Sequence, residues 1–239
     1  MKPKYLIMRQ IAPFLKDLLF PRRCVSCGKI DTFLCDKCAS MMLSVSSHKC
    51  LFCKKMIDGQ ICDSCKKEFR VKNAYVSVYY REGPARDLIV NLKFKGKKEI
   101  AGLMGTMVAE KMLQSWRVRP FRGSNPFKDY VLVPVPLDKR RKNERGFNQS
   151  ELLARELGRS LGLEVRKILG KRLRAPQMGL NRKERQQNLK GAFYGISKPP
   201  KKVLLVDDVL TTGATVKECT RVLKENGARE VAVAVFARD

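Results

Sequence analysis

The side chains best suited to chemistry in this chain lie in residues 201–215, which read KKVLLVDDVLTTGAT. An apolar run, 203–206, leads to two adjacent carboxylates, Asp207 and Asp208. A small polar turn follows, made of Thr211, Thr212, Gly213, Ala214 and Thr215. Apolar residues then recur at helical spacing up to Gly227. The pattern predicts a strand, an acidic tip, a turn and a helix.

This combination of groups predicts a sugar-phosphate site. A turn at a helix N-terminus presents backbone N–H groups and, here, three hydroxyls, all of which can bind an anion. The two carboxylates cannot hold a phosphate, but they can accept hydrogen bonds from neighbouring hydroxyls of a sugar. A ribose 5-phosphate satisfies both halves of the site. The alternative is a buried strand and a capped helix, in which the acidic pair has no role.

Eight of the nine cysteines form four Cys-x-x-Cys pairs: Cys24 and Cys27, Cys35 and Cys38, Cys50 and Cys53, Cys62 and Cys65. Each pair directs two thiolates at one point, and two pairs complete a tetrahedral Cys₄ zinc site. Consecutive pairing predicts two tandem zinc ribbons and two zinc ions per chain. A module of this size folds only with its metal, so the predicted role of zinc is structural.

Other uses of these cysteines fit the spacing less well. Disulfides are typical of secreted chains and do not require a strict two-residue spacing. Iron–sulfur clusters more often use a Cys-x-x-Cys-x-x-Cys run, which this sequence lacks. Pairing of the first knuckle with the third, in a cross-braced arrangement, remains open.

The charge of the chain predicts a polyanionic partner. The net charge is +27 over 239 residues, and residues 71–200 carry 29 basic against 11 acidic side chains. Residues 139–190 alone carry 16 basic and 5 acidic ones. This excess is larger than solubility requires, and it favours binding of a nucleic acid.

Length and hydropathy set the expected organisation. No apolar run approaches the ~20 residues that span a bilayer, and no cleavage site follows the apolar patches near the start, so we expect a cytoplasmic protein without a membrane span. We expect an amphipathic segment at 1–23, a double zinc ribbon at 24–70 and one main domain at 71–239.

Alternating strand and helix patterns predict an α/β main domain with a parallel sheet. The strands are expected at 73–81, 130–135, 165–169, 203–206 and 230–236, and the helices at 85–94, 100–116, 150–161 and 216–223. We expect 139–145 to be a basic loop and 170–190 a mobile flap that leads to a strand at Phe193. Phe94, Phe147 and Tyr194 could stack on bases of a single strand, but for Phe94 and Tyr194 a position in the core is the expectation. Ligands bind outside the carboxyl ends of such strands, so the basic loop and residues 207–215 should face one crevice.

The quoted motifs resemble two related groups of proteins. Residues 201–215 resemble the 5-phosphoribosyl-1-pyrophosphate (PRPP) motif of type I phosphoribosyltransferases. Nearly the whole chain resembles the competence protein F (ComF/ComFC) family, through the cysteine module after LLFP, LKFKG at 92–96, VPVP at 133–136, RGFNQ at 145–149 and the set Gln177, Arg185, Asn188 and Phe193. The resemblance implies an N-terminal zinc-ribbon module followed by a domain with the type I phosphoribosyltransferase-like fold.

The resemblance also implies site roles and partners. Asp207 and Asp208 would hold the ribose 2- and 3-hydroxyls, and residues 211–215 would surround the 5-phosphate. The family is associated with incoming single-stranded DNA, and it suggests DNA-processing proteins as partners.

Two functions follow from these residues, an adaptor that binds PRPP and single-stranded DNA, and an active phosphoribosyltransferase. The expected pyrophosphate or phosphate contacts are Arg140, Arg141, Arg145 and Arg185, with Mg²⁺ bridging the ribose and the pyrophosphate. The expected DNA contacts are Lys93, Lys95, Lys139, Lys142 and Arg182. No residue identifies an acceptor for the transferred sugar.

Overall fold

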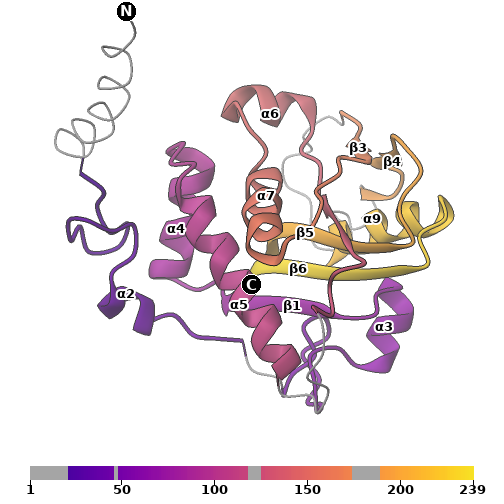
Figure 1. The fold of residues 1–239 in the computed structure, drawn as a ribbon, viewed down its shortest axis with the longest axis horizontal. Helices are drawn as coiled ribbons and strands as arrows, with labels where there is room; N and C mark the ends of the chain where they lie inside the picture. The colour runs from indigo at the N-terminus through magenta and orange to yellow at the C-terminus, as the bar shows by residue number, and fades with distance from the viewer. Residues whose placement is uncertain (1–20, 46–47, 118–124, 174–188) are drawn as a thin grey trace, which may run out of the picture.

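A parallel four-stranded sheet forms the centre of the protein (Figure 1). The computed structural model describes residues 21–45, 48–117, 125–173 and 189–239. The strand order is β1-β6-β5-β2, and all three pairings are parallel. The bounds are β1 Ala74–Tyr79, β2 Val131–Pro134, β5 Lys202–Leu210 and β6 Glu230–Arg238. The fold is therefore the parallel α/β class that the sequence predicts.

Both faces of the sheet are covered, which explains the nearly continuous apolar runs of its central strands. In β5, Val203 and Leu205 face one core, whereas Leu204 and Val206 face the other. Three helices pack on the second of these faces: α4 Pro84–Phe94, α5 Ile100–Arg117 and α7 Gln149–Leu161. A single long helix, α9 Ala214–Glu225, packs on the first. Figure 1 shows α4, α5 and α7 grouped together, with α9 apart from them.

The packing of α5 against α7 depends on one small residue. A Cβ atom on Gly105 would lie 2.6 Å from the Cβ of Glu156 in α7 and 3.1 Å from the backbone nitrogen of Leu157. A Cβ atom essentially never lies as close as 2.6 Å to another carbon, so a larger residue would push the helices apart. The approach sets the place of α7, whose first residues reach the end of β5.

The connections of β2 and β5 part at the carboxyl edge of the sheet, and the space between their two loops is the predicted crevice. β2 and β5 are neighbours, but the chain leaves β2 toward α7 on one face and leaves β5 toward α9 on the other. The two loops therefore diverge at the carboxyl ends of adjacent strands. Such a topological switch point is where open α/β sheets bind ligands.

The two cysteine modules attach to different cores. The first, with α2 Asp36–Ser40, buries a small cluster of cysteines beside Leu34, and its Val25 and Phe33 pack against the core of α4 and α5. The second, with α3 Asp63–Phe69, contributes Phe52 and Phe69 directly to the core beneath α9. Figure 1 shows α2 on the α4 side and α3 on the opposite side of the molecule.

The structure corrects three sequence predictions about local structure. The basic segment expected as a loop is a helix, α6 Lys139–Arg145, because Asp138 caps it and accepts from Arg141 N at 3.0 Å. The predicted strand at 165–169 is displaced to β3 Leu169–Lys171, and Val165 contributes only a bridge to Leu132. β3 pairs antiparallel with β4 Phe193–Gly195, outside the main sheet. Most of the expected flap, 174–188, lies outside the described residues.

Two aromatic residues expected in the core lie at the surface instead. Phe94 is 69% exposed and Tyr194 is 42% exposed. Phe94 stands two residues after the buried Leu92, so on a helix it points away from the side that Leu92 covers. Tyr194 alternates with the buried Phe193 along a short strand, which places it on the outer face.

Candidate functional site

The acidic pair lies within β5, at the carboxyl edge of the sheet. The strand does not end at Val206, as the sequence suggested, but continues through both carboxylates to Leu210. Val206 is opposite Pro134 at the end of β2, so the acidic pair begins where β2 stops. Strand alternation sends the two side chains to opposite sides, and each meets a different helix.

Each carboxylate has a polar partner from a distant part of the chain. Asp208 is only 6% exposed, and its Oδ1 accepts from Lys93 Nζ of α4 at 2.9 Å. Asp207 retains some solvent contact, and its Oδ1 accepts from Ser150 Oγ of α7 at 2.9 Å. The same oxygen accepts from the backbone N–H of Asp208 at 2.9 Å. These bonds offset part of the cost of bringing two acids together in a packed site.

The environment of Asp207 favours its protonated form. Loss of solvation among the packed atoms and the neighbouring charge of Asp208 raise the pKa of Asp207 to about 7, although Ser150 and the Asp208 N–H act in the opposite direction. Strongly raised carboxyl pKa values cluster at functional sites, because the groups there need pKa values matched to their task. The pair therefore carries a proton that a ligand or a cation could displace.

The sequence RGFNQS at 145–150 explains how Ser150 reaches Asp207. Gly146 ends α6 with a φ of 74°, and Phe147 is buried. Asn148 caps α7 by accepting from Ser150 N at 3.1 Å, and it donates to the carbonyl oxygen of Val135 at 2.9 Å. The cap therefore ties the start of α7 to the end of β2 and aims Ser150 at β5.

The turn at 211–215 lies at the N-terminus of α9, as predicted. The helix begins at Ala214 after Gly213, whose φ is 78°, and its first turn contains no acidic residue. Thr212 Oγ1 accepts from Ala214 N at 3.3 Å, while Thr211 is exposed. The geometry presents backbone N–H groups and hydroxyls at the positive end of a helix dipole, which suits an anion.

Two aromatic residues of the second cysteine module pack against this turn. Phe52 and Phe69 stack with ring centroids 4.0 Å apart, and a Cβ atom on Gly213 would lie 2.8 Å and 2.6 Å from their respective rings. Both the positive φ and the close rings therefore require glycine at this position. The ion pair between Lys217 Nζ and Glu68, at 2.8 Å, joins α9 to α3 beside the contact.

A buried arginine adds a second link between the module and the end of β5. Arg238 is 5% exposed, and its Nε donates to the carbonyl oxygen of Leu51 at 2.5 Å. Its Nη1 donates to the carbonyl oxygen of Leu210 at 3.3 Å, directly before the turn. One side chain thus holds a cysteine knuckle and the exit of β5 in a fixed relation.

Helix α6 carries the predicted basic residues to the rim of the crevice. Lys139, Arg140, Arg141 and Lys142 are exposed. Arg140 pairs with Glu144 at 3.0 Å, and Arg141 lies 3.9 Å from Asp138. Arg145 is half-buried: burial lowers its pKa, and the charge of Asp208 opposes that shift.

The other predicted basic residues differ in their placement. Lys93 forms the ion pair with Asp208, whereas Lys95 is exposed. Arg182 and Arg185 lie outside the described residues.

Sequence reasoning missed three residues of the crevice, Ser150, Asp138 and Lys171. Lys171 Nζ on β3 lies 4.0 Å from Asp138 Oδ2 and 5.3 Å from the ring centroid of Phe193. Burial lowers the pKa of Lys171, and Asp138 partly restores it. Asp138 was signalled by its place one residue before a run that ends at Gly146, which is a helix-cap pattern. Nothing local signals Lys171.

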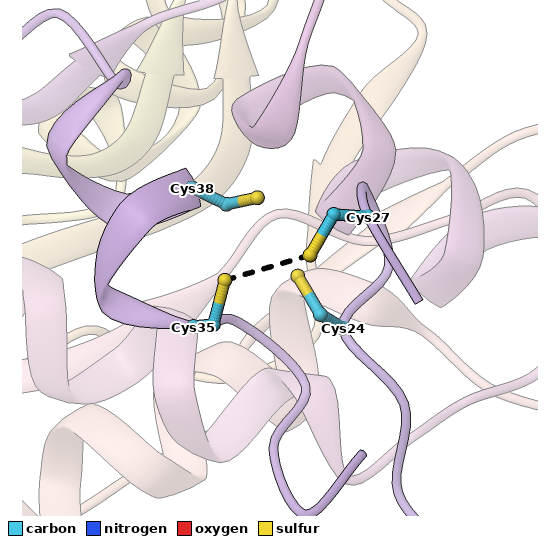
Figure 2. Close-up of side chains that lie close together, drawn as sticks. All are labelled: Cys24, Cys27, Cys35 and Cys38. Atoms are coloured by element: carbon cyan, nitrogen blue, oxygen red, sulfur yellow. Dashed lines mark hydrogen bonds between the residues drawn. The ribbon is translucent and has the colours of Figure 1, made fainter. Parts of the chain in front are cut away.

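The eight cysteines form two groups of four, Cys24, Cys27, Cys35 and Cys38, and Cys50, Cys53, Cys62 and Cys65. Within each group the sulfur atoms lie within 4.8 Å of one another. The pairing is consecutive, which excludes the cross-braced alternative in this structure. Figure 2 shows the four sulfurs of the first group turned toward one point, with Cys27 and Cys35 3.5 Å apart.

The geometry of both groups fits a tetrahedral metal. Zinc–sulfur bonds of about 2.3 Å imply sulfur–sulfur separations of about 3.8 Å. The separations of 3.5 Å between Cys27 and Cys35 and 3.7 Å between Cys53 and Cys62 are close to that value. Burial would raise the pKa of Cys50, but N–H groups of Cys53 and Cys62 lower it to about 6. A thiolate is therefore favoured there even before a cation adds its charge.

Comparison with known proteins gives consistent matches. Residues 151–239 match the phosphoribosyl transferase domain family. The chain is 30% identical to Competence protein F of Haemophilus influenzae over 229 residues, which cover 92% of this chain and 98% of that protein. It is 35% identical to DNA utilization protein YhgH of Salmonella typhi, over 74% of this chain and 77% of that one.

Two further comparisons gave the following matches. Competence protein ComFC of Streptococcus pneumoniae is 28% identical, over 84% of this chain and 86% of that one. A solved structure titled as the allosteric regulatory enzyme of purine biosynthesis aligns with a TM-score of 0.35 and 18% identity, over 56% of this chain and 25% of that one. In the described part of the chain, no helix is long and apolar enough to cross a membrane.

Removal of one ligand from each cysteine group should have different effects. Cys38→Ser and Cys65→Ser are each expected to reduce the metal content from two ions to one, measured by elemental analysis of the purified protein. Only Cys65→Ser should accelerate hydrogen exchange of the amides at 211–215, because only the second module supports the turn. Equal exchange in the two variants would contradict the proposed support.

The raised pKa of Asp207 predicts a pH-dependent stability. Between its ordinary value of 3.8 and about 7, the folded protein holds a proton that the unfolded chain has lost, so the free energy of unfolding falls as pH rises. Asp207→Asn keeps the acceptor for Ser150 but has no proton to lose. The difference in the free energy of unfolding, Asp207→Asn minus native protein, should therefore increase by about 1–3 kcal/mol from pH 4 to pH 8. Urea denaturation at each pH measures it.

Asp129→Asn is the matched control for this measurement. Lys202 lowers the pKa of Asp129, so this carboxylate stabilises the folded state as pH rises through its unfolded value. Because both pKa values of Asp129 lie at or below 3.8, the stability of this control relative to the native protein should stay nearly constant between pH 4 and pH 8 and change only in more acidic solution. A difference between Asp207→Asn and the native protein that does not vary with pH would contradict the prediction.

Proposed function

This chain belongs to the competence protein F family, and from that premise we propose that it binds PRPP in the crevice and handles single-stranded DNA in the cytoplasm during DNA uptake. The relatives carry the names Competence protein F and DNA utilization protein, which supports a role with DNA. The observation that carries the PRPP half is the acidic pair beside the N-terminus of α9 at the switch point between β2 and β5.

Each half of the crevice suits one part of PRPP. Ionised Asp207 and Asp208 would accept hydrogen bonds from the two ribose hydroxyls. The amides and hydroxyls at 211–215 would bind the 5-phosphate. Arg140, Arg141 and Arg145 would contact the pyrophosphate, and Mg²⁺ would bridge its oxygens to the ribose, since this ion is commonly held by substrate phosphates.

The cysteine groups complete the proposed cofactor set with two zinc ions. Four thiolates within 4.8 Å of one another favour zinc over the harder cations, which prefer oxygen. The ions would act structurally. Through Phe52 and Phe69, the second would also stabilise the turn under the 5-phosphate.

A second candidate function is phosphoribosyl transfer, favoured by the match of residues 151–239 to the phosphoribosyl transferase domain family. A nitrogen nucleophile would form a bond to C1 of PRPP while the C1–oxygen bond breaks and pyrophosphate leaves with the electron pair. Positioning and stabilisation of the leaving charge would be the contribution of the protein. Pyrophosphate release in the presence of one nitrogenous acceptor would support transfer, whereas binding without release would support the adaptor.

The acidic pair provides the test of PRPP binding. Asp207→Asn combined with Asp208→Asn removes both charges, and each charge-assisted hydrogen bond is worth ~1.5–3 kcal/mol. We expect the affinity for PRPP with Mg²⁺ to fall by at least about 100-fold in calorimetry, with an unchanged far-UV circular dichroism spectrum. Asp129→Asn, at the opposite end of the sheet, should bind as the native protein does. Unchanged affinity in the double variant would reject the PRPP site.

The basic surface of α6 provides the test of DNA binding. For single-stranded DNA, the logarithm of the binding constant falls with the logarithm of salt concentration, with a slope of ~0.7 for each phosphate that the protein neutralises. Replacing Arg140, Arg141 and Lys142 with alanine should therefore make this slope shallower by about two units. The triple alanine variant of Lys66 in α3 with Lys72 and Lys202, which lie before β1 and at the start of β5, removes the same charge at the opposite end of the sheet. If both triple variants flatten the slope equally, the effect is one of net charge and the α6 interface is wrong.

A further inference from the structure

Phe94 is exposed at a position where nothing in the fold requires an aromatic residue. Its side chain is 69% exposed, and no large apolar side chain in the described residues is more exposed. The large apolar residues Leu88, Ile89 and Leu92 of α4 are buried, and Val90 is half-buried. The packing of α4 therefore does not use the ring.

The ring lies at the rim of the acidic crevice. Its neighbour in sequence, Lys93, reaches Asp208 at 2.9 Å. The guanidinium carbon of Arg145, at the end of α6, lies 5.1 Å from the ring centroid, and Asp208 acts on the same guanidinium by its charge. Phe94 is thus connected through two basic residues to the carboxylate proposed to hold a ribose.

The surroundings of the ring favour a ligand that is both planar and anionic. The cation of Arg145 fixes the ring by a cation–π contact, and most of the ring surface remains open. Lys95 and Lys98 are exposed within four residues of it, and Lys98 Nζ lies 5.1 Å from the ring centroid of Phe147. Aromatic rings flanked by cations are how proteins bind bases of single strands without a sequence preference.

We propose that Phe94 is a stacking platform for a nitrogenous base held at the mouth of the sugar-phosphate crevice. The proposal rests on the proposed function and adds to it the class of ligand part that the rim would bind. Two sources share this chemistry, a base of single-stranded DNA and a free base presented to bound PRPP. Arg145 orients the ring from one side, and the base stacks on the open part.

The experiment uses the full chain with its metals and compares Phe94→Ala, Phe94→Leu and Phe94→Trp. The first probe is a single-stranded oligonucleotide that carries the fluorescent base 2-aminopurine. The second is an abasic strand of the same length, which keeps the phosphates but has no bases. If a base stacks on the ring, Phe94→Ala should bind the oligonucleotide about 5- to 100-fold more weakly than the native protein does. Phe94→Leu should lose as much although it keeps apolar bulk, and Phe94→Trp should retain the affinity.

Three readouts separate stacking from other effects. The abasic strand should bind all variants alike, because it has no ring to stack. The slope of affinity against log salt should not change in any variant, because no charge is removed. Tyr194→Ala is the matched control, since this exposed aromatic also lies beneath an arginine, with Arg172 5.8 Å from its centroid, but on the β3–β4 hairpin.

Separate measurements with the oligonucleotide and with a free base distinguish the source of the base. Adenine titrated into the complex with PRPP, followed by calorimetry, tests the free base, and a loss in Phe94→Ala confined to this arm would assign the platform to an acceptor. PRPP alone should bind Phe94→Ala within about twofold of the native protein. Failure of PRPP binding in the native protein would reject the proposed function, a result separate from the stacking arms.

Two outcomes would overturn the platform. One is equal affinity of Phe94→Ala and native protein for both the oligonucleotide and adenine. The other is full retention by Phe94→Leu, which would show that the position needs an apolar surface, as a protein partner would, and not a ring.

Discussion

Two adjacent carboxylates at the end of a strand that is buried on both faces are the constraint on which the rest of this structure depends. Burying ionised groups costs free energy unless charges or hydrogen bonds compensate them. Asp208 is compensated by Lys93 from α4, and Asp207 by Ser150 from α7. Both helices must therefore end or begin at the carboxyl edge of β5.

The end of β5, beyond the acidic pair, is under a different constraint. There the chain must make a turn with a positive φ and then start α9, and stacked aromatic rings from the second cysteine module fill the space beneath. Two cysteine groups of nearly identical spacing thus have unequal consequences. The first packs near α4 through Val25 and Phe33, whereas the second forms part of the core behind the turn.

Much of this architecture could be predicted from sequence because it is encoded locally. Apolar periodicity identified the strands of the sheet, and the strict cysteine spacing identified the two tetrads. The helix at 139–145 was missed because it has no apolar face, although Asp138 and Gly146 mark its ends. The partners of the acidic pair could not be predicted, since Lys93 and Asp208 are 115 residues apart and no spacing rule connects them.

The exposure of Phe94 is an intermediate case. Its distance of two residues from Leu92 already turned it away from the buried side of α4, so the helical period contained the answer. The prediction of a core position gave more weight to residue type than to position. That Arg145, at the end of α6, lies over this ring depends on tertiary structure and cannot be predicted from either segment alone.

The link from Arg238 to Leu51 spans 187 residues, and it has a consequence for how the protein is made. Contacts between segments so far apart in sequence form late, after the intervening chain has lost its freedom. During synthesis the knuckle at Leu51 leaves the ribosome long before β6 exists to receive it. The turn at 211–215 is therefore expected to be among the last parts to take its final shape, after the final strand is in place.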